Sequence, residues 1–199
     1  MRREIISEFY PALAALVLFT ILTGLVYPLV VTVVSQAVLP HQANGSLIMR
    51  DGSATGSELI GQPFSNAKYF WGRPSATTPY PYNAGSSSGS NLGPTNPDLE
   101  KAVAERIKVL QEVDPGSSAP VPADLVTSSA SGLDPHISPE AAKYQVPRVA
   151  RARGLSVEEV RRLVNEKTEG RTWEMLGEPR VNVLRLNRAL DMMSAAHSR

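Results

Sequence analysis

Residues 11–39 read PALAALVLFTILTGLVYPLVVTVVSQAVL, the most apolar part of this chain of 199 residues. From Phe9 to Met49 the sequence contains no Asp, Glu, Lys or Arg. At about 1.5 Å per residue such a helix reaches about 43 Å, more than the roughly 30 Å hydrocarbon core of a bilayer. The sequence therefore predicts one transmembrane helix over residues 11–39, after a short N-terminal segment, residues 1–10, and before a single soluble domain, residues 40–199.

A cleaved signal peptide is the alternative interpretation of the same segment. Ser35, Gln36 and Ala37 resemble a small-x-small cleavage site that follows an apolar run. However, the apolar region of a signal peptide is only about 7–15 residues long. The length of the run favours a retained anchor.

The charges that flank the apolar helix predict its orientation. Arg2 and Arg3 precede it, whereas Arg50 is the only Lys or Arg within about 15 residues after it. The positive-inside rule then places the N-terminus in the cytoplasm. We expect a single-pass protein of a bacterial inner (cell) membrane, with the domain in the periplasm or outside the cell.

Four residues of the helix are candidates for packing against another helix. Thr20, Gly24 and Tyr27 share one side at helical spacing, and small or hydroxylated residues allow close helix approach in lipid. Pro28 lacks an amide hydrogen and crowds the carbonyl of Gly24, which predicts a kink. A lipid-facing helix with incidental Gly and Thr is the open alternative.

The bulk composition excludes several kinds of site. Lys and Arg number 20 against 19 Asp and Glu, a net charge of +1, so nucleic acid is a poor candidate partner. The absence of cysteine excludes disulfides, thiol nucleophiles and zinc-thiolate sites. The histidines, His41, His136 and His197, are scattered, and we expect no metal site.

The soluble part has the signals of an α+β domain. A short apolar run, residues 46–50, meets an Asp-Gly turn and a returning strand over residues 54–60, which indicates a hairpin. Capping residues predict helices that begin after Asn96, Ser138 and Ser156. The second of these helices should be interrupted at Pro147 and end at Gly154, and the third should stop at Gly170.

Other segments are read from composition. Residues 114–122 are rich in Pro and Ser and predict an exposed loop, and the Gly/Ser-rich residues 77–97 predict a flexible linker. Tyr69, Phe70 and Trp71 are expected on an extended strand as core anchors, with a ligand-binding aromatic cage as the alternative. Residues 181–190 fit either a strand or a helix capped by Asn182, and we favour the helix.

Two short patterns resemble catalytic motifs, and neither predicts catalysis. Ser65 and Lys68 match S-x-x-K of acyl-serine enzymes, but the S-D-N and K-T-G elements are absent. Asp134, His136 and Ser138 name a triad without its geometry, and Ser138 serves better as a helix cap. We expect no catalytic residue, with a membrane-tethered serine hydrolase as the alternative.

A series of short stretches occurs along the chain in a characteristic order: YPL at 27–29, ANGSLI at 43–48, GSELIGQ at 56–62, GRPSA at 72–76, YN at 82–83, GSNL at 89–92, DLVT at 124–127, SGLD at 131–134, PRVA at 147–150, LSV at 155–157, GEP at 177–179 and VNVL at 181–184. Taken together, these stretches resemble the C subunit of the bacterial potassium-transporting P-type ATPase, the KdpC family.

The resemblance implies a non-catalytic subunit of a complex that imports potassium at the expense of ATP. Its partners would be a channel-like, potassium-selective subunit and a P-type subunit that hydrolyses ATP. The family is described as supporting assembly and as a catalytic chaperone that raises ATP affinity. No cofactor is expected in this chain, whose nucleotide-binding residues stay unknown, because ATP and potassium are handled by the complex.

We also expect a surface that contacts a partner or lines an ion entrance. The polar loop of residues 82–91 offers hydroxyls and carbonyls that suit weak, multiple ion contacts. The residues expected at this surface are Trp71, Arg73, Tyr82, Asn83, Ser90, Asn91, Asp134, His136 and Arg148.

Overall fold

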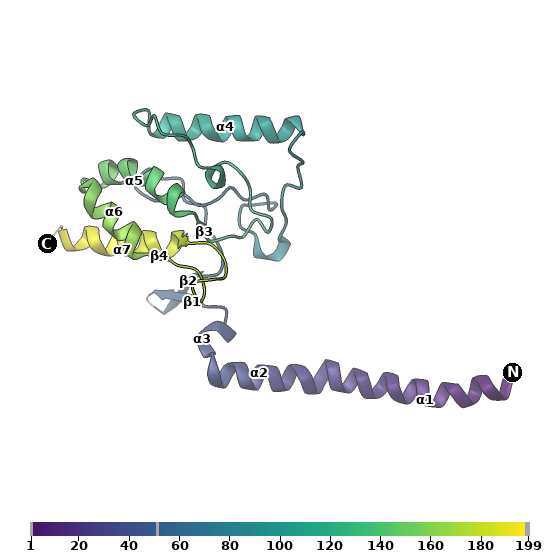
Figure 1. The fold of residues 1–199 in the computed structure, drawn as a ribbon. Coiled ribbons are helices and arrows are strands. Elements are labelled where there is room, and N and C mark those ends of the chain that lie inside the picture. The colour runs from purple at the N-terminus through teal and green to yellow at the C-terminus, as the bar shows by residue number, and fades with distance from the viewer. Residues whose placement is uncertain (1, 51, 198–199) are drawn as a thin grey trace. The chain divides into compact units, whose positions relative to one another are not determined.

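The computed structural model describes residues 2–50 and 52–197 (Figure 1). The chain divides into two compact units, Met1–Leu47 and Ile48–Arg199. The first unit consists of α1 (Arg2–Ile21), a π-helical turn η1 (Leu22–Val26), α2 (Tyr27–Val38) and the short α3 (Pro40–Ala43). Its apolar part, Ser7–Val38, is long enough to cross a membrane and is not buried by the rest of the chain. This agrees with the prediction of one N-terminal apolar helix followed by an α+β domain.

The distortion expected near Pro28 takes the form of the π-helical turn η1. Pro28 has no amide hydrogen to offer the Gly24 carbonyl, and the Tyr27 amide instead donates to the carbonyl of Leu22, five residues earlier. A π turn inserts one extra residue, so Thr20 and Tyr27 do not have the spacing of an uninterrupted α-helix. The packing role of this face stays a prediction.

The second unit contains two small antiparallel arrangements of strands. β1 (Leu47–Arg50) and β2 (Ser53–Ser57) form a two-stranded sheet. The expected hairpin is therefore present with a shorter second strand, and Asp51 of its turn lies outside the described residues. β3 (His136–Ile137), β4 (Thr168–Glu169) and β5 (Arg180–Asn182) form a three-stranded sheet with β5 in the centre.

Four helices supply most of the regular secondary structure in the described part of this unit. They are α4 (Pro97–Val113), α5 (Pro139–Arg153), α6 (Val157–Glu166) and α7 (Val183–His197), with short 3-10 turns η2 (Ala84–Ser86) and η3 (Ala123–Leu125). The predicted caps are confirmed: the side chains of Asn96 and Ser138 accept backbone N–H bonds, and Ser156 with Glu159 forms a capping box. Gly154 ends α5 in the left-handed region at φ 66°.

Two helix predictions need correction, and a third is confirmed. Pro147 does not interrupt α5. Helix residues before and after it, such as Val146 and Val149, are buried in the core, and this packing outweighs the helical hydrogen bond that proline cannot donate. α6 ends at Glu166 rather than Gly170, because Thr168 and Glu169 pair with β5. The helix favoured for residues 181–190 is confirmed: α7 begins at Val183, and Asn182 caps it by accepting the Arg185 N–H at 3.1 Å. The strand alternative holds only for the residues up to Asn182, which belong to β5.

The core lies between α5, α6 and α7, which Figure 1 shows gathered together, with Phe70 also fully buried. α4 reaches this core through Leu110, and its Val103 and Ile107 are packed against it. The remaining members are the side chains of Leu125, Val126, Ile137, Ala141, Ala142, Val146, Val149, Ala150, Val160, Leu163, Val164, Val181, Val183, Leu186 and Leu190.

The two compositional loops are attached more firmly than their sequences indicate. Between residues 77 and 97 the only helix in the described residues is the short η2 before α4 begins, yet the Ser87 hydroxyl donates to the Ser131 carbonyl at 3.0 Å. In residues 114–122, Asp114 is buried and accepts a bond from Arg151 at 3.0 Å, while most of the loop is exposed.

Candidate functional site

Two buried amide side chains hold residues 69–71, the aromatic segment, in place. The Phe70 N–H donates to Asn187 Oδ1 at 2.8 Å and the Asn187 amide donates to the Phe70 carbonyl at 2.9 Å. Gln145 does the same for Trp71, at 2.8 and 3.1 Å. Each amide offers one donor and one acceptor, as a neighbouring strand would. The segment, which we expected to be a strand, is therefore satisfied by side chains of α5 and α7 instead.

Arg148 completes this support. Its guanidinium lies 4.6 Å from the centre of the Trp71 ring, a cation–π contact. It also donates to the carbonyls of Ala67 and Tyr69, at 2.6 and 3.1 Å, and to Gln145 Oε1 at 2.6 Å. Burial lowers the pKa of Arg148 to about 10. The structure thus brings together two of the residues singled out in the sequence, Trp71 and Arg148.

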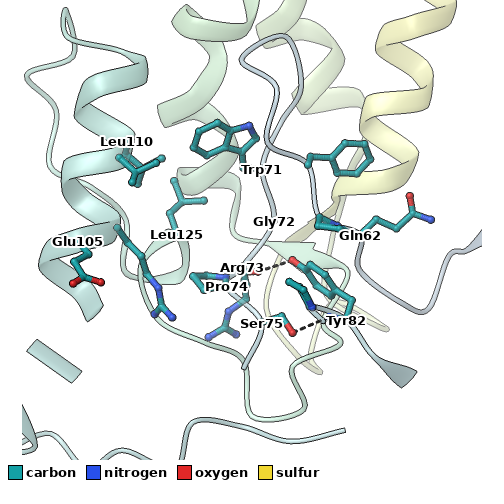
Figure 2. Close-up of a pocket in the computed structure, with 15 residues that line it drawn as sticks. Gln62, Trp71, Gly72, Arg73, Pro74, Ser75, Tyr82, Glu105, Leu110 and Leu125 are labelled. Atoms are coloured by element: carbon teal, nitrogen blue, oxygen red, sulfur yellow. Dashed lines mark hydrogen bonds between the residues drawn. The ribbon is translucent and has the colours of Figure 1, made fainter. Parts of the chain in front are cut away.

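Beside this segment lies a cavity of about 430 Å³ (Figure 2). Its walls come from four separate parts of the domain: the loop around residues 62–75, the 81–82 turn, Leu125 of η3, and one face of α4. The side chains that give it chemical character are those of Trp71, Arg73, Tyr82, Glu105 and Arg106.

Tyr82 lines the cavity, and Figure 2 shows its hydroxyl donating to the Arg73 carbonyl and its amide donating to Ser75 Oγ. Its φ of 57° lies in the left-handed region. A side chain at Gly61 would place a Cβ 2.2 Å from the Tyr82 ring, so this approach requires glycine. Burial, followed by the charge of Asp134, raises the pKa of Tyr82 to about 12, so the hydroxyl stays a donor.

Arg73, which lines the cavity, also belongs to a polar cluster with Asp134 and His136, which line a separate hollow. Arg73 Nη1 lies 3.4 Å from Asp134 Oδ2, and His136 Nδ1 lies 3.5 Å from Asp134 Oδ1. Burial alone would raise the pKa of Asp134, but the hydrogen bonds from His136 and the charge of Arg73 together lower it. The buried Arg73 Nε has no hydrogen-bond partner among the described residues. Apart from that nitrogen, the charged groups of Arg73, Asp134 and His136 are paired with one another.

Arg106 is a site residue that sequence reasoning missed. It projects from α4, donates to the Val126 carbonyl at 2.7 Å and to Ser128 Oγ at 3.3 Å, and has its pKa lowered by burial. Its signal in the sequence was its place beside Ile107 in the apolar stripe of α4. Gln145 and Asn187 gave a similar signal, since each is a polar residue among the mainly apolar residues on the buried face of its helix.

The remaining expected residues lie apart from the cavity. The Asn83 side chain accepts from the Gly85 N–H at 3.1 Å and donates to the Thr78 carbonyl at 2.7 Å, so it shapes its own loop. Ser90 and Asn91 are exposed and do not line the cavity. Their role at a partner contact or ion entrance stays a prediction.

The motifs that resembled catalytic sites are used otherwise in the structure. The Ser138 hydroxyl accepts from the Ala141 N–H as the cap of α5 and bonds Asp124 at 3.2 Å. The Lys68 ammonium lies 5.3 Å from the centre of the Tyr69 ring. Among the described residues no group of three or more His, Cys, Asp or Glu side chains could hold a metal ion. The cavity is therefore lined by side chains of both charges together with aromatic and apolar side chains.

Comparison with known proteins gives a consistent result. The family model described as the c chain of the K⁺-transporting ATPase matches residues 9–192. A protein of Methylococcus capsulatus is 61% identical over 188 residues, which cover 94% of this chain and 99% of that protein. A protein of Sorangium cellulosum is 60% identical over 186 residues, covering 94% and 98%. Both are named as the KdpC subunit of a potassium-transporting ATPase.

Proposed function

The chain belongs to the KdpC family of K⁺-transporting ATPase c chains, and from this premise we propose that it is a non-catalytic accessory subunit that supports assembly of the complex. As a member of that family it is a component of a potassium uptake ATPase. In the proposal, a channel-like chain selects potassium, a P-type chain hydrolyses ATP, and this chain helps to hold them together.

The observation that carries the proposal is the extent of the family match. It runs from residue 9 to residue 192 and so includes both the apolar helix and the whole cavity region. A membrane helix that is apolar on all sides and a domain with rigid polar surface suit a subunit that makes contacts in two environments. Both parts of the chain are then available for assembly.

The proposed orientation places the domain outside the cytoplasm of a bacterial inner membrane. Support comes from the arginines before the apolar helix, Arg2 and Arg3, against the single Arg50 soon after it. Fusion of a reporter that is active only outside the cytoplasm tests this directly. Activity of the C-terminal fusion is expected, and activity of an N-terminal fusion would reverse the orientation.

The proposal extends to a catalytic chaperone role, in which the chain raises the ATP affinity of the hydrolysing subunit. A domain outside the cytoplasm cannot touch cytoplasmic ATP. Its effect would pass through the membrane helices as a coupling free energy, which for other systems is about 1–3 kcal/mol, or 5–150-fold in affinity. The reciprocal expectation is that ATP strengthens the binding of this chain to the complex by the same factor.

Co-purification tests the assembly role. The intact tagged chain, solubilised in mild detergent, should bring other membrane proteins of the complex with it. Gly24→Leu should weaken this several-fold. A Cβ at Gly24 would meet nothing within 4 Å beyond the backbone of its own helix, so the larger side chain would obstruct only an outside helix. Ala15→Leu, a similar enlargement away from the Thr20/Gly24/Tyr27 face, is the control. Unchanged assembly of the Gly24 variant would remove the helix contact from the proposal.

A further inference from the structure

The loop that joins β4 to β5 displays three apolar side chains to solvent. Trp173 is 81% exposed, Met175 80% and Leu176 56%, and we name these three residues the apolar tip. The tip sits on an ordered hairpin-like loop, in which Thr172 and Leu176 exchange two backbone hydrogen bonds of 2.8 and 2.9 Å. Side chains of this size are usually buried, so their common exposure marks an interaction surface.

The loop is held in one conformation before any partner arrives. At its base Arg171 Nη2 donates to both oxygens of Glu178, at 2.9 and 2.8 Å. Trp173 and Glu174 have φ values of 53° and 61°, a region that bulky residues rarely adopt. This strained conformation keeps Trp173 in solvent, so it adds nothing to the packing of the core. It does reduce the ordering that binding would require.

The stem below the tip is tied to the rest of the domain by charge pairs. Glu169 bonds Arg180 at 3.1 Å and Arg185 at 2.9 Å, and Arg185 also pairs with Glu58. The Asn182 amide donates to the Glu58 carbonyl at 2.8 Å. Because these charges are matched, the stem gives the tip no net positive field.

Glu174 decides which kind of partner fits. It lies between Trp173 and Met175 in the sequence and carries the only charge within residues 172–176. A carboxylate at the tip opposes insertion into a bilayer that contains anionic lipid. An apolar pocket with Lys or Arg at its rim would instead accept both the apolar side chains and the carboxylate.

We infer that the apolar tip docks into an apolar, basic-rimmed pocket on another protein chain of the ATPase complex. This inference rests on the proposed function, since it requires the chain to be a subunit. Trp173 would be the anchor of the contact, because a large aromatic side chain in a desolvated pocket commonly dominates interface energetics. Glu174 would fix the orientation through the basic rim.

The test uses the full chain co-expressed with the other chains of the complex and solubilised in detergent. Trp173→Asn/Met175→Gln removes the apolar contact and keeps a residue that tolerates positive φ at position 173. Association should weaken by about 10–100-fold. Met192→Gln, at an α7 position that is 66% exposed, is the matched control and should leave association unchanged. Thermal unfolding of each isolated variant checks that the fold is kept.

Charge reversal supplies a second, independent arm. Glu174→Lys should weaken association at low salt, and this loss should shrink as ionic strength rises, because the carboxylate and the basic rim are screened. If the double variant proves unfolded, Glu174→Lys decides the question alone. A Glu174→Lys complex that forms as well as the wild type at every salt concentration would then overturn the inference.

The remaining outcomes separate this inference from the proposed function. If the wild-type chain brings partners and the folded double variant brings them equally well, the inference fails and the proposed function stands. If the wild-type chain co-purifies with no other chain of the complex, both the inference and the proposed function fail. If Trp173 fluorescence of the chain alone in nanodiscs is quenched by brominated lipid, and Trp173→Asn abolishes that signal, the tip binds the bilayer and the inference is wrong.

Discussion

Replacement of Asn187 by leucine should detach the aromatic segment from α7. Leucine has the same branching but cannot hydrogen-bond to Phe70, whose N–H and carbonyl are joined to Asn187 at 2.8 and 2.9 Å. Phe70 has no exposed surface, so water cannot replace these bonds. Each unpaired buried group costs about 1–3 kcal/mol, which gives a loss of about 2–6 kcal/mol in the free energy of unfolding.

Urea unfolding of the full chain in detergent, followed by far-UV circular dichroism, measures this loss. With a slope of about 1–3 kcal/mol per M, the midpoint should fall by roughly 2 M. Asn165→Leu is the control, because Asn165 is an exposed asparagine on α6, and its effect should stay within about 0.5 kcal/mol. Equal midpoints for the two variants would refute the pairing role of Asn187.

A double variant sharpens the same prediction. Gln145→Leu removes the equivalent bonds of Trp71, the next residue along the segment. Once one replacement has released the segment, the second should cost less, so the two losses should sum to more than the loss of the double variant by about 0.5–3 kcal/mol. Strict additivity would mean that the two amides act on independent structures.

Two further predictions concern Tyr82, which lines the cavity. Tyr82→Phe should remove a pH-dependent part of the free energy of unfolding. Burial raises the pKa of Tyr82 from 10.0 to about 12, so the folded state favours the neutral phenol. The stabilisation that this phenol gives is complete below pH 10 and is lost as the pH rises through 12. The stability advantage of the wild type over the variant, measured by urea unfolding at each pH, should therefore fall by about 1.4 kcal/mol per pH unit in that window. A constant advantage would contradict this. Gly61→Ala should lower the free energy of unfolding by about 1–3 kcal/mol, because the new Cβ would clash with the Tyr82 ring. Gly93→Ala is the control, because a Cβ there would meet open space. Equal melting temperatures for the two variants would refute the close approach of Gly61 to Tyr82.

Local signals predicted the helices well because the interactions that begin a helix span only a few residues. Asn96 accepts from an amide two residues ahead, and Ser156 exchanges bonds with Glu159 three residues ahead. Such contacts are visible in the sequence as patterns of residue type. The end of α6 was missed for the opposite reason, since it depends on pairing between Thr168 and Val181.

The candidate site was only partly accessible to sequence reasoning. Trp71 and Arg148 were chosen as separate residues, and their contact joins positions far apart in the chain. Arg106 was missed because its partners, Val126 and Ser128, lie about 20 residues away on a segment without regular structure. The apolar tip was missed as well: a Trp, a Met and a Leu in sequence are the usual marks of a core, and exposure is not written in residue type.

The apolar helix and the α+β class follow from sequence alone, because hydrophobic length and capping patterns are properties of neighbouring residues. The same holds for the family resemblance. The tertiary structure alone decided that buried amides take the place of a strand beside Phe70, that Pro147 stays within its helix, and that Trp173 faces solvent. These outcomes depend on which distant groups meet, and the free energy of burying or satisfying a group is set by those neighbours.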